Sequence, residues 1–194
     1  MKVIGITGGV GSGKSAVLTY LNTKYGAVIC QLDDVAKKLQ KKGTCCYQNI
    51  IEVFGEQILD PSGELDRKAL GKIVFQNEKQ LQKLNAIVHP EVKRAVQQEI
   101  AEREEESIPL FVIEAALLPT AGYETICDEM WYVYTEESVR RERLKCSRGY
   151  TEKEITDMMR SQPEETVFRQ FCDVMLDNSG SFEDTKKQIG ELLI

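Results

Sequence analysis

Residues 8–15, near the start of this 194-residue chain, have the types and spacing of a phosphate-binding loop. They spell G-x-x-x-x-G-K-S and end on Lys14 and Ser15, between an apolar β-branched segment and a segment with helical periodicity. Glycines let the backbone turn its N–H groups toward phosphate oxygens, and the N-terminus of the following helix favours an anion. In this motif the lysine reaches the terminal phosphates and the serine hydroxyl ligates Mg²⁺. The pattern predicts that the chain binds a nucleoside triphosphate.

Two aspartates follow the second apolar segment, 27–30, which is typical of a buried parallel strand. The carboxyl ends of parallel strands form the edge at which open α/β sheets bind ligands. A carboxylate there can accept a hydroxyl proton or help to hold Mg²⁺, but an aspartate at this point can also simply cap the next helix. We assign Asp34 to the cap and Asp33 to chemistry. Glu114, at the end of a later apolar segment, is a weaker candidate for holding Mg²⁺.

A basic segment with interleaved glutamates follows the fourth apolar segment, and its cationic residues are Arg140, Arg141, Arg143, Lys145 and Arg148. One interpretation is a solvated helix face. The other is a lid whose arginines clamp transferring phosphoryl groups, and the presence of a phosphate-binding loop favours it. Thr151 and Glu154 then form a T-x-x-E capping box that begins a new helix.

The elements that must position these groups alternate along the chain. Short apolar strands are predicted at 3–7, 27–30, 110–114, 130–134 and 174–177, with helices at 14–24, 136–147, about 151–162 and 181–194. Gly26 is expected to end the first helix. This alternation predicts an α/β fold, a P-loop kinase core with a five-stranded parallel sheet wrapped by helices.

About 75 residues between the second and third strands show only helical patterns, at 34–42, 45–54, 67–75 and 78–87 with a continuation to about 106. Because Pro90 cannot donate a backbone hydrogen bond, we expect a helix junction at His89-Pro90. We therefore predict one kinase domain over 1–194 with three parts: a nucleotide-binding core (1–32, 107–136 and 166–194), a helical acceptor-binding insertion (33–106) and a lid (137–165).

Composition excludes several classes of protein. The net charge is −6 and the pI is near 5.1, so we expect no nucleic-acid partner and no membrane surface. No run approaches the roughly 18 apolar residues that span a bilayer, and we expect no signal peptide because the N-terminus leads directly into a strand. Six cysteines without C-x-x-C spacing and a single histidine argue against a zinc site and favour a reducing cytoplasm.

The remaining motifs favour a small-molecule kinase over other nucleotide-binding classes. The chain lacks the guanine-reading N-K-x-D, and its D-x-x-G match at 60–63 lies within the helical insertion, where we interpret it as a turn. A motor or AAA-type ATPase needs a longer domain. A kinase needs an acceptor site, a lid and a carboxylate near the acceptor hydroxyl, and the chain offers a candidate for each.

The chain resembles the dephospho-coenzyme A kinases nearly from end to end. Besides the loop, the resemblance rests on Asp33, on G-E-L-D-R at 63–67, on V-F at 74–75, on L-N-A-I-V-H-P at 84–90, on R-L at 143–144 with S-R-G at 147–149, on R-S-Q at 160–162 and on D-V-M-L-D-N-S-G at 173–180. This sequence departs from the usual family pattern at Gln31 and Ala16, and at 116–120, where it reads A-L-L-P-T.

The resemblance implies that ATP, with Mg²⁺, phosphorylates the ribose 3′-hydroxyl of 3′-dephospho-coenzyme A, the last step of coenzyme A synthesis. It also implies site roles, which are listed here: catalytic Asp33, Lys14 and Arg143; ATP-binding Gly11, Ser12, Gly13, Lys14, Ser15, Ala16 and Arg148; acceptor-side Asp33, Arg67 and His89; metal-binding Ser15. We expect a monomer or weak homo-oligomer. The alternatives are another kinase of the nucleoside monophosphate type and a weakly active ATP-binding regulatory homologue.

Overall fold

The computed structural model describes residues 1–116 and 122–193. The chain forms one five-stranded sheet in the order β2-β3-β1-β4-β5. The strands are β1 (Lys2–Thr7), β2 (Val28–Gln31), β3 (Leu110–Glu114), β4 (Glu129–Tyr134) and β5 (Val174–Asp177). These are the five strands that the apolar segments predicted, with bounds that agree to within one residue. The departure from the family pattern was noted at 116–120, and residues 117–120 of that segment lie outside the described residues.

The strands run parallel, so their carboxyl ends meet at one edge of the sheet. Strand β1 pairs with β3 on one side and β4 on the other, and β4 pairs with β5. Ile4, for example, lies opposite Val112 in β3. The predicted α/β class is therefore confirmed, and the phosphate-binding loop leaves from the carboxyl end of the central strand.

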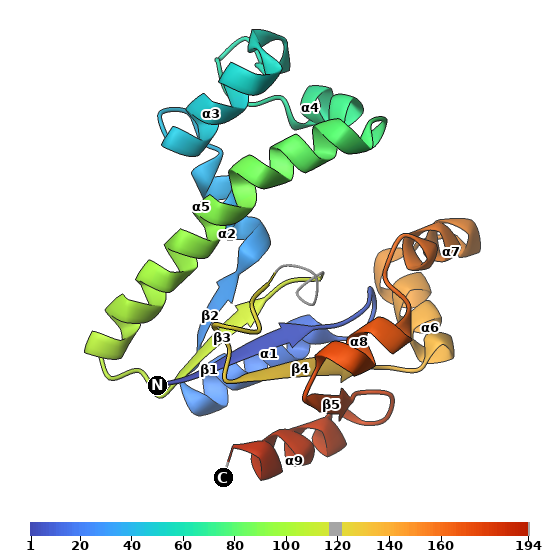
Figure 1. The fold of residues 1–194 in the computed structure, drawn as a ribbon. Helices are drawn as coiled ribbons and strands as arrows, with labels where there is room; N and C mark the ends of the chain where they lie inside the picture. The colour runs from blue at the N-terminus through green and yellow to red at the C-terminus, as the bar shows by residue number, and fades with distance from the viewer. Residues whose placement is uncertain (117–121, 194) are drawn as a thin grey trace. The chain divides into compact units, whose positions relative to one another are not determined.

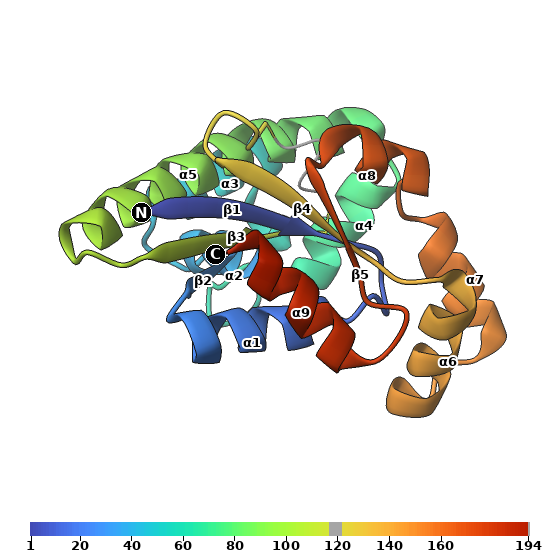
Figure 2. The same cartoon turned by 90° about the horizontal axis from the view of Figure 1, so that it is seen from below.

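Two helices cover one face of the sheet, and Figure 2 shows them side by side below it. They are α1 (Lys14–Tyr25), which ends at a left-handed Gly26 as predicted, and α9 (Phe182–Leu192). The core between them and the sheet is apolar and almost fully buried; it includes Ile4, Ile6, Val17, Leu21, Val112, Trp131, Val133, Leu176 and Ile189. Tyr20 of α1 and Phe182 of α9 meet edge to face, with ring centroids 6.0 Å apart.

The opposite face carries helix α8 (Glu165–Phe171), which the sequence patterns did not predict. Its buried residue is Phe168, which stacks on Tyr132 of β4 with ring centroids 4.9 Å apart. A seven-residue helix with a single buried side chain has no repeating apolar spacing, so hydrophobic periodicity could not reveal it.

Helices α6 (Glu137–Arg148) and α7 (Glu152–Arg160) follow β4 and contact each other (Figure 1). The predicted capping box of α7 is present: the Thr151 side chain accepts from the backbone N–H of Glu154, whose carboxylate accepts from the backbone N–H of Thr151. Both helices belong to a compact unit formed by 1–30 and 103–194. Their separate role as a lid stays a prediction.

Residues 31–102 form a second compact unit. Its elements are α2 (Leu32–Leu39), α3 (Cys45–Phe54), a short 3₁₀ helix η1 (Glu56–Ile58), α4 (Arg67–Phe75) and most of α5 (Glu78–Glu105). The turn predicted at 60–63 is confirmed, because the Asp60 carboxylate accepts from the backbone N–H groups of Ser62 and Glu64 at 2.8 and 3.1 Å.

The helix junction expected at His89-Pro90 is wrong, because α5 is continuous and Pro90 lies inside it. Proline removes one backbone hydrogen bond from a helix interior. On the same helix Val88, Val92 and Val96 are buried at a spacing of four residues. Burial of this apolar stripe offsets the lost bond, so the helix passes through the proline.

No helix among the described residues is long and apolar enough to cross a membrane.

The core under the phosphate-binding loop predicts a clear stability effect. Replacing the fully buried Ile189 of α9 by alanine leaves a cavity, and we expect a loss of about 2–5 kcal/mol in the free energy of unfolding measured by urea denaturation. Exposed Glu191→Ala on the same helix is the control, with an expected change below about 0.5 kcal/mol. A loss below about 1 kcal/mol for Ile189→Ala would contradict the packing described above.

Candidate active site

The loop between β1 and α1 has the geometry that anion binding requires. Gly11 and Gly13 have φ of 78° and 86°, in the left-handed region that favours glycine, and Gly13 is the N-terminal cap of α1. Within the loop the backbone N–H of Ser12 donates to the Gly9 carbonyl at 3.1 Å. Among the residues that the structure describes, no side chain caps α1, which leaves N–H groups of its first turn available to an anion.

A buried hydrogen-bond network fixes the loop to the ends of two strands. The Ser12 carbonyl accepts from the Asn178 Nδ2 at 2.7 Å and from the Thr135 Oγ1 at 3.0 Å. Asn178 follows β5 and Thr135 follows β4; both are 3% exposed, so these bonds are shielded from water. Thr185 of α9 donates to the Asn178 Oδ1 at 2.9 Å and so fixes the amide orientation. A Cβ atom at Gly13 would overlap the Asn178 amide.

The side chain of Lys14, the first residue of α1, reaches back to the first residue of the loop. Its Nζ donates to the Gly8 carbonyl at 2.6 Å and lies 4.0 Å from the Glu114 carboxylate at the end of β3. Both side chains are largely buried, at 16% and 14% exposed. The motif lysine therefore lies beside an acid from the neighbouring strand. Glu114 can approach it because it is the last residue of β3, at the carboxyl edge of the sheet.

Two side chains that follow β4 in the chain reach the first half of the loop. The backbone N–H of Val10 donates to the Gln162 Oε1 at 2.9 Å. A Cβ atom at Gly9 would overlap the guanidinium of Arg140, so that guanidinium lies directly against the loop backbone. Leu144 of α6 packs near Gly11. Helix α6 and the segment just after α7 therefore contact the loop that was predicted to bind phosphate.

The basic residues of α6 fall into two groups. Arg141 and Lys145 form ion pairs with glutamates of α6 and α7, including Glu152, as a solvated helix face would. Arg143 points to the loop side, where it donates to the Asn178 carbonyl at 2.9 Å and to Thr135 at 3.5 Å. Arg148, at the end of α6, is exposed. The solvated-face interpretation therefore describes Arg141 and Lys145, whereas the clamp stays a prediction for the others.

Buried polar atoms mark the same region. The Ser12 Oγ and the Arg140 Nε are buried without a hydrogen-bond partner among the described residues. Burial raises the pKa of Tyr132 above its ordinary value, Glu165 adds to this, and Arg140 acts in the opposite direction. Arg140 therefore places positive charge beside the loop. An anion is the natural partner for such a group.

The predicted acceptor-side residues lie in the second compact unit. Asp33 is the second residue of α2, Arg67 is the first residue of α4, and His89 is in the middle of α5; all three side chains are exposed. Arg67 follows Asp66, whose carboxylate caps α4 by accepting from the N–H groups of Lys68 and Ala69.

The capping role expected for Asp34 is wrong, because α2 begins two residues earlier than predicted. Its N-terminal cap is Gln31, which makes no side-chain capping bond. Asp34 instead pairs with Lys37 at 2.6 Å, and this hydrogen bond is the main cause of the lowered pKa of its carboxyl group. Neither aspartate is the N-terminal cap of α2, and the chemical role of Asp33 stays a prediction.

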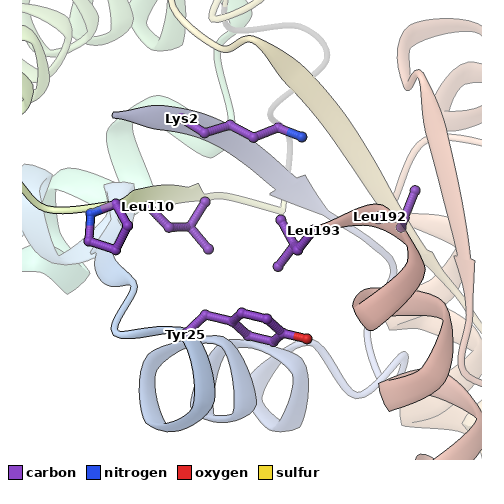
Figure 3. Close-up of a pocket in the computed structure, with 6 residues that line it drawn as sticks. Lys2, Tyr25, Leu110, Leu192 and Leu193 are labelled. Carbon is purple, nitrogen blue, oxygen red and sulfur yellow. The ribbon is translucent and has the colours of Figure 1, made fainter.

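A cavity of about 250 Å³ lies on a different part of the sheet (Figure 3). Its lining includes Lys2 at the start of β1, Leu110 at the start of β3 and Tyr25 at the end of α1, together with Pro109, Leu192 and Leu193. These residues mark the amino edge of the sheet, whereas the phosphate-binding loop leaves from the carboxyl edge. The cavity is therefore separate from the candidate site.

Sequence reasoning did not assign four residues that touch the loop: Thr135, Arg140, Gln162 and Asn178. Arg140 lay within a recognised basic segment, and Asn178 follows a predicted strand end, so a signal existed for both. Gln162 ends the R-S-Q segment on which the resemblance partly rests, but nothing in the local sequence marks Thr135 as a contact of Ser12, more than 100 positions away.

A strand, a glycine-rich loop and a helix N-terminus, with a lysine and nearby arginines, define a P-loop nucleotide-binding protein of the small-molecule kinase class. A family model described as dephospho-CoA kinase matches residues 2–184. A dephospho-CoA kinase from Carboxydothermus hydrogenoformans is 38% identical over 195 residues, covering 100% of this chain and 93% of the relative. The relative of that name from Geobacter sulfurreducens is 36% identical, covering 99% and 97%. The chain belongs to the dephospho-CoA kinase family, which is a family of ATP-dependent transferases.

Solved structures support the same fold. A crystal structure of a Thermus thermophilus protein superposes with a TM-score of 0.82 at 31% identity, covering 99% of this chain and 96% of that one. Shikimate kinase from Acinetobacter baumannii, solved with shikimate, has a TM-score of 0.52 at 16% identity, covering 100% and 93%. The second likeness concerns the fold alone. The predicted resemblance and fold are both confirmed.

The anchoring network predicts a specific loss of ATP affinity. Asn178→Ala removes one of the two donors to the buried Ser12 carbonyl and leaves the loop less well fixed, so we expect ATP to bind about tenfold more weakly by calorimetry. Exposed Asn49→Ala in α3 is the matched control. If a folded Asn178→Ala protein, checked by circular dichroism, bound ATP like the wild type, the network would have no role in the site.

Proposed function

We propose that this chain transfers the γ-phosphoryl group of ATP to the ribose 3′-hydroxyl of 3′-dephospho-coenzyme A, giving coenzyme A and ADP. The observation that carries the proposal is the pre-formed loop, over which the Lys14 Nζ reaches back to Gly8, in a chain that matches the dephospho-CoA kinase family from residue 2 to residue 184. The family match favours this acceptor over a nucleoside monophosphate.

The residues divide into a donor side and an acceptor side. On the donor side, the loop segment 11–16 would bind the phosphates through its N–H groups, and Lys14 would stabilise charge on the transferring group. Arg143 is next to the loop anchor at Asn178 and would assist from α6, and Arg148 is a further candidate for ATP contact. On the acceptor side, Asp33 would accept the proton of the attacking hydroxyl, with Arg67 and His89 as candidate contacts to the acceptor.

Mg²⁺ fits this donor side. Protein sites for this ion commonly supply one or two oxygen ligands and leave the rest to substrate phosphates and water. The Ser15 hydroxyl, exposed in the first turn of α1, and the Glu114 carboxylate near Lys14 are oxygen donors of the required kind. When bound, the ion would neutralise charge on the phosphates of ATP.

The family name implies a small-molecule partner, and we propose a monomer or weak homo-oligomer that works in the cytoplasm. All six cysteines are free thiols, which supports a reducing compartment.

The reaction itself is testable with purified protein, Mg-ATP and 3′-dephospho-coenzyme A. Mass spectrometry should show an acceptor that gains the mass of one phosphoryl group only when ATP is present. Lys14→Ala should lower turnover about 100-fold or more, because it removes the loop cation. Lys24→Ala, exposed in the last turn of the same helix, should leave turnover unchanged. A wild-type protein that gives no ATP-dependent product would refute the proposed function.

The role of Asp33 has a matched neighbour for comparison. Asp33→Asn should lower kcat by about 100-fold or more, as loss of a general base does, with a smaller change in the KM for ATP. Asp34→Asn, which breaks only the exposed pair with Lys37, should leave kcat near the wild-type value. Equal kcat values for the two variants would remove Asp33 from the chemistry.

A further inference from the structure

Arg140 is a cation held against the phosphate-binding loop. Its guanidinium contacts Gly9 closely enough that a Cβ atom there would overlap the Nη1, and its own backbone carbonyl lies near Gly11. The side chain is half-buried, and its Nε is buried without a hydrogen-bond partner among the described residues. A guanidinium presents five donors in one plane, which matches the oxygens of a phosphate group.

The charge of Arg140 is not neutralised by the acids around it. Glu137, one turn earlier on α6, pairs with Arg141 at 2.8 Å. Arg141 also reaches Glu152 of α7 at 3.3 Å. Over the described ranges, Arg140 makes no ion pair of its own. Because holding a cation away from water without a counter-charge costs free energy, the site gains when an anion arrives.

The position along the loop indicates which part of a nucleotide Arg140 would meet. The motif lysine serves the terminal phosphates, and the Lys14 Nζ lies on the Gly8 carbonyl at 2.6 Å. Arg140 contacts the next residue, Gly9, so the two cations flank the same end of the loop. The N-terminus of α1, at Lys14–Ala16, forms the other end.

Gln162 holds the neighbouring backbone in place. Its Oε1 accepts from the Val10 N–H at 2.9 Å and lies close to Gly9 as well. This contact comes from the residue two positions after α7, while Arg140 comes from α6. The first half of the loop is therefore contacted near Gly9 by both an amide oxygen and a cation.

We propose that Arg140 is a further catalytic residue, which contacts the terminal phosphate of ATP and stabilises the charge that develops on it during transfer. The proposal rests on the proposed function, since it takes ATP as the donor. Arg143 hydrogen-bonds to the loop anchor, whereas Arg140 has donors left for the ligand. Charge stabilisation by an arginine at a transferring phosphoryl group is a general way to lower this barrier.

The test compares ATP with ADP, because a contact to the terminal phosphate is absent from ADP. By calorimetry, Arg140→Gln should raise the Kd for ATP about tenfold and leave the Kd for ADP within about twofold of the wild type. Arg140→Lys, which keeps the charge, should bind ATP more tightly than Arg140→Gln. Arg141→Gln, which removes the ion-paired neighbour, should leave both affinities near the wild-type values.

Turnover adds a second readout. With Mg-ATP and the acceptor, Arg140→Gln should lower kcat about tenfold or more, with partial recovery in Arg140→Lys. Equal weakening of ATP and ADP, or unchanged binding of both, would overturn the proposal. Since the binding comparison needs no acceptor, it remains decisive for Arg140 even if the protein fails to phosphorylate 3′-dephospho-coenzyme A, which would refute the proposed function alone.

Discussion

The carbonyl of Ser12 and its two buried donors are the interaction on which the site depends. A glycine-rich loop has little intrinsic preference for one conformation, and fixing it costs conformational entropy. Asn178 and Thr135, at the carboxyl ends of β5 and β4, hold one carbonyl of the loop from the sheet. Thr185 of α9 donates to Asn178 and so connects the network to this helix. The loop is therefore linked by hydrogen bonds to a helix that packs in the apolar core. The loop is thereby organised before any nucleotide arrives, which lowers the cost of binding.

Helices α6 and α7 add charge to this rigid base. The alternation of arginine and glutamate along α6 was by itself consistent with a solvated face and with a phosphate clamp, and only the phosphate-binding loop favoured the clamp. In the structure the basic residues of the helix divide between two faces, because residues three apart on a helix share a face, and the clamp stays a prediction. Arg140 and Arg143 are turned toward the loop and its anchor, and Arg141 is turned toward the glutamates. The interleaved glutamates therefore keep the outer arginine occupied and leave the inner ones for the site.

Local patterns predicted the parts of the fold that local patterns determine. The five strands and the capping box of α7 follow from short apolar runs and from one T-x-x-E spacing. Pro90 was misjudged because the buried valines on either side of it outweigh one missing hydrogen bond, and that balance depends on what covers the helix. Asp34 was misjudged because α2 begins at Leu32, a boundary that the sequence could not fix. The sequence marked the segments that hold Asn178 and Arg140, but not their particular contacts with the loop, since each joins residues more than 100 positions apart.

The central claim is that the loop holds ATP for transfer to one particular oxygen of the acceptor. Phosphorus NMR of the purified product, formed from Mg-ATP and 3′-dephospho-coenzyme A, tests it most directly because it locates the new phosphate on the ribose. The predicted spectrum shows a phosphomonoester on the 3′-oxygen, formed in step with ADP. A phosphate on another oxygen, or ADP and inorganic phosphate without a phosphorylated acceptor, would contradict the claim.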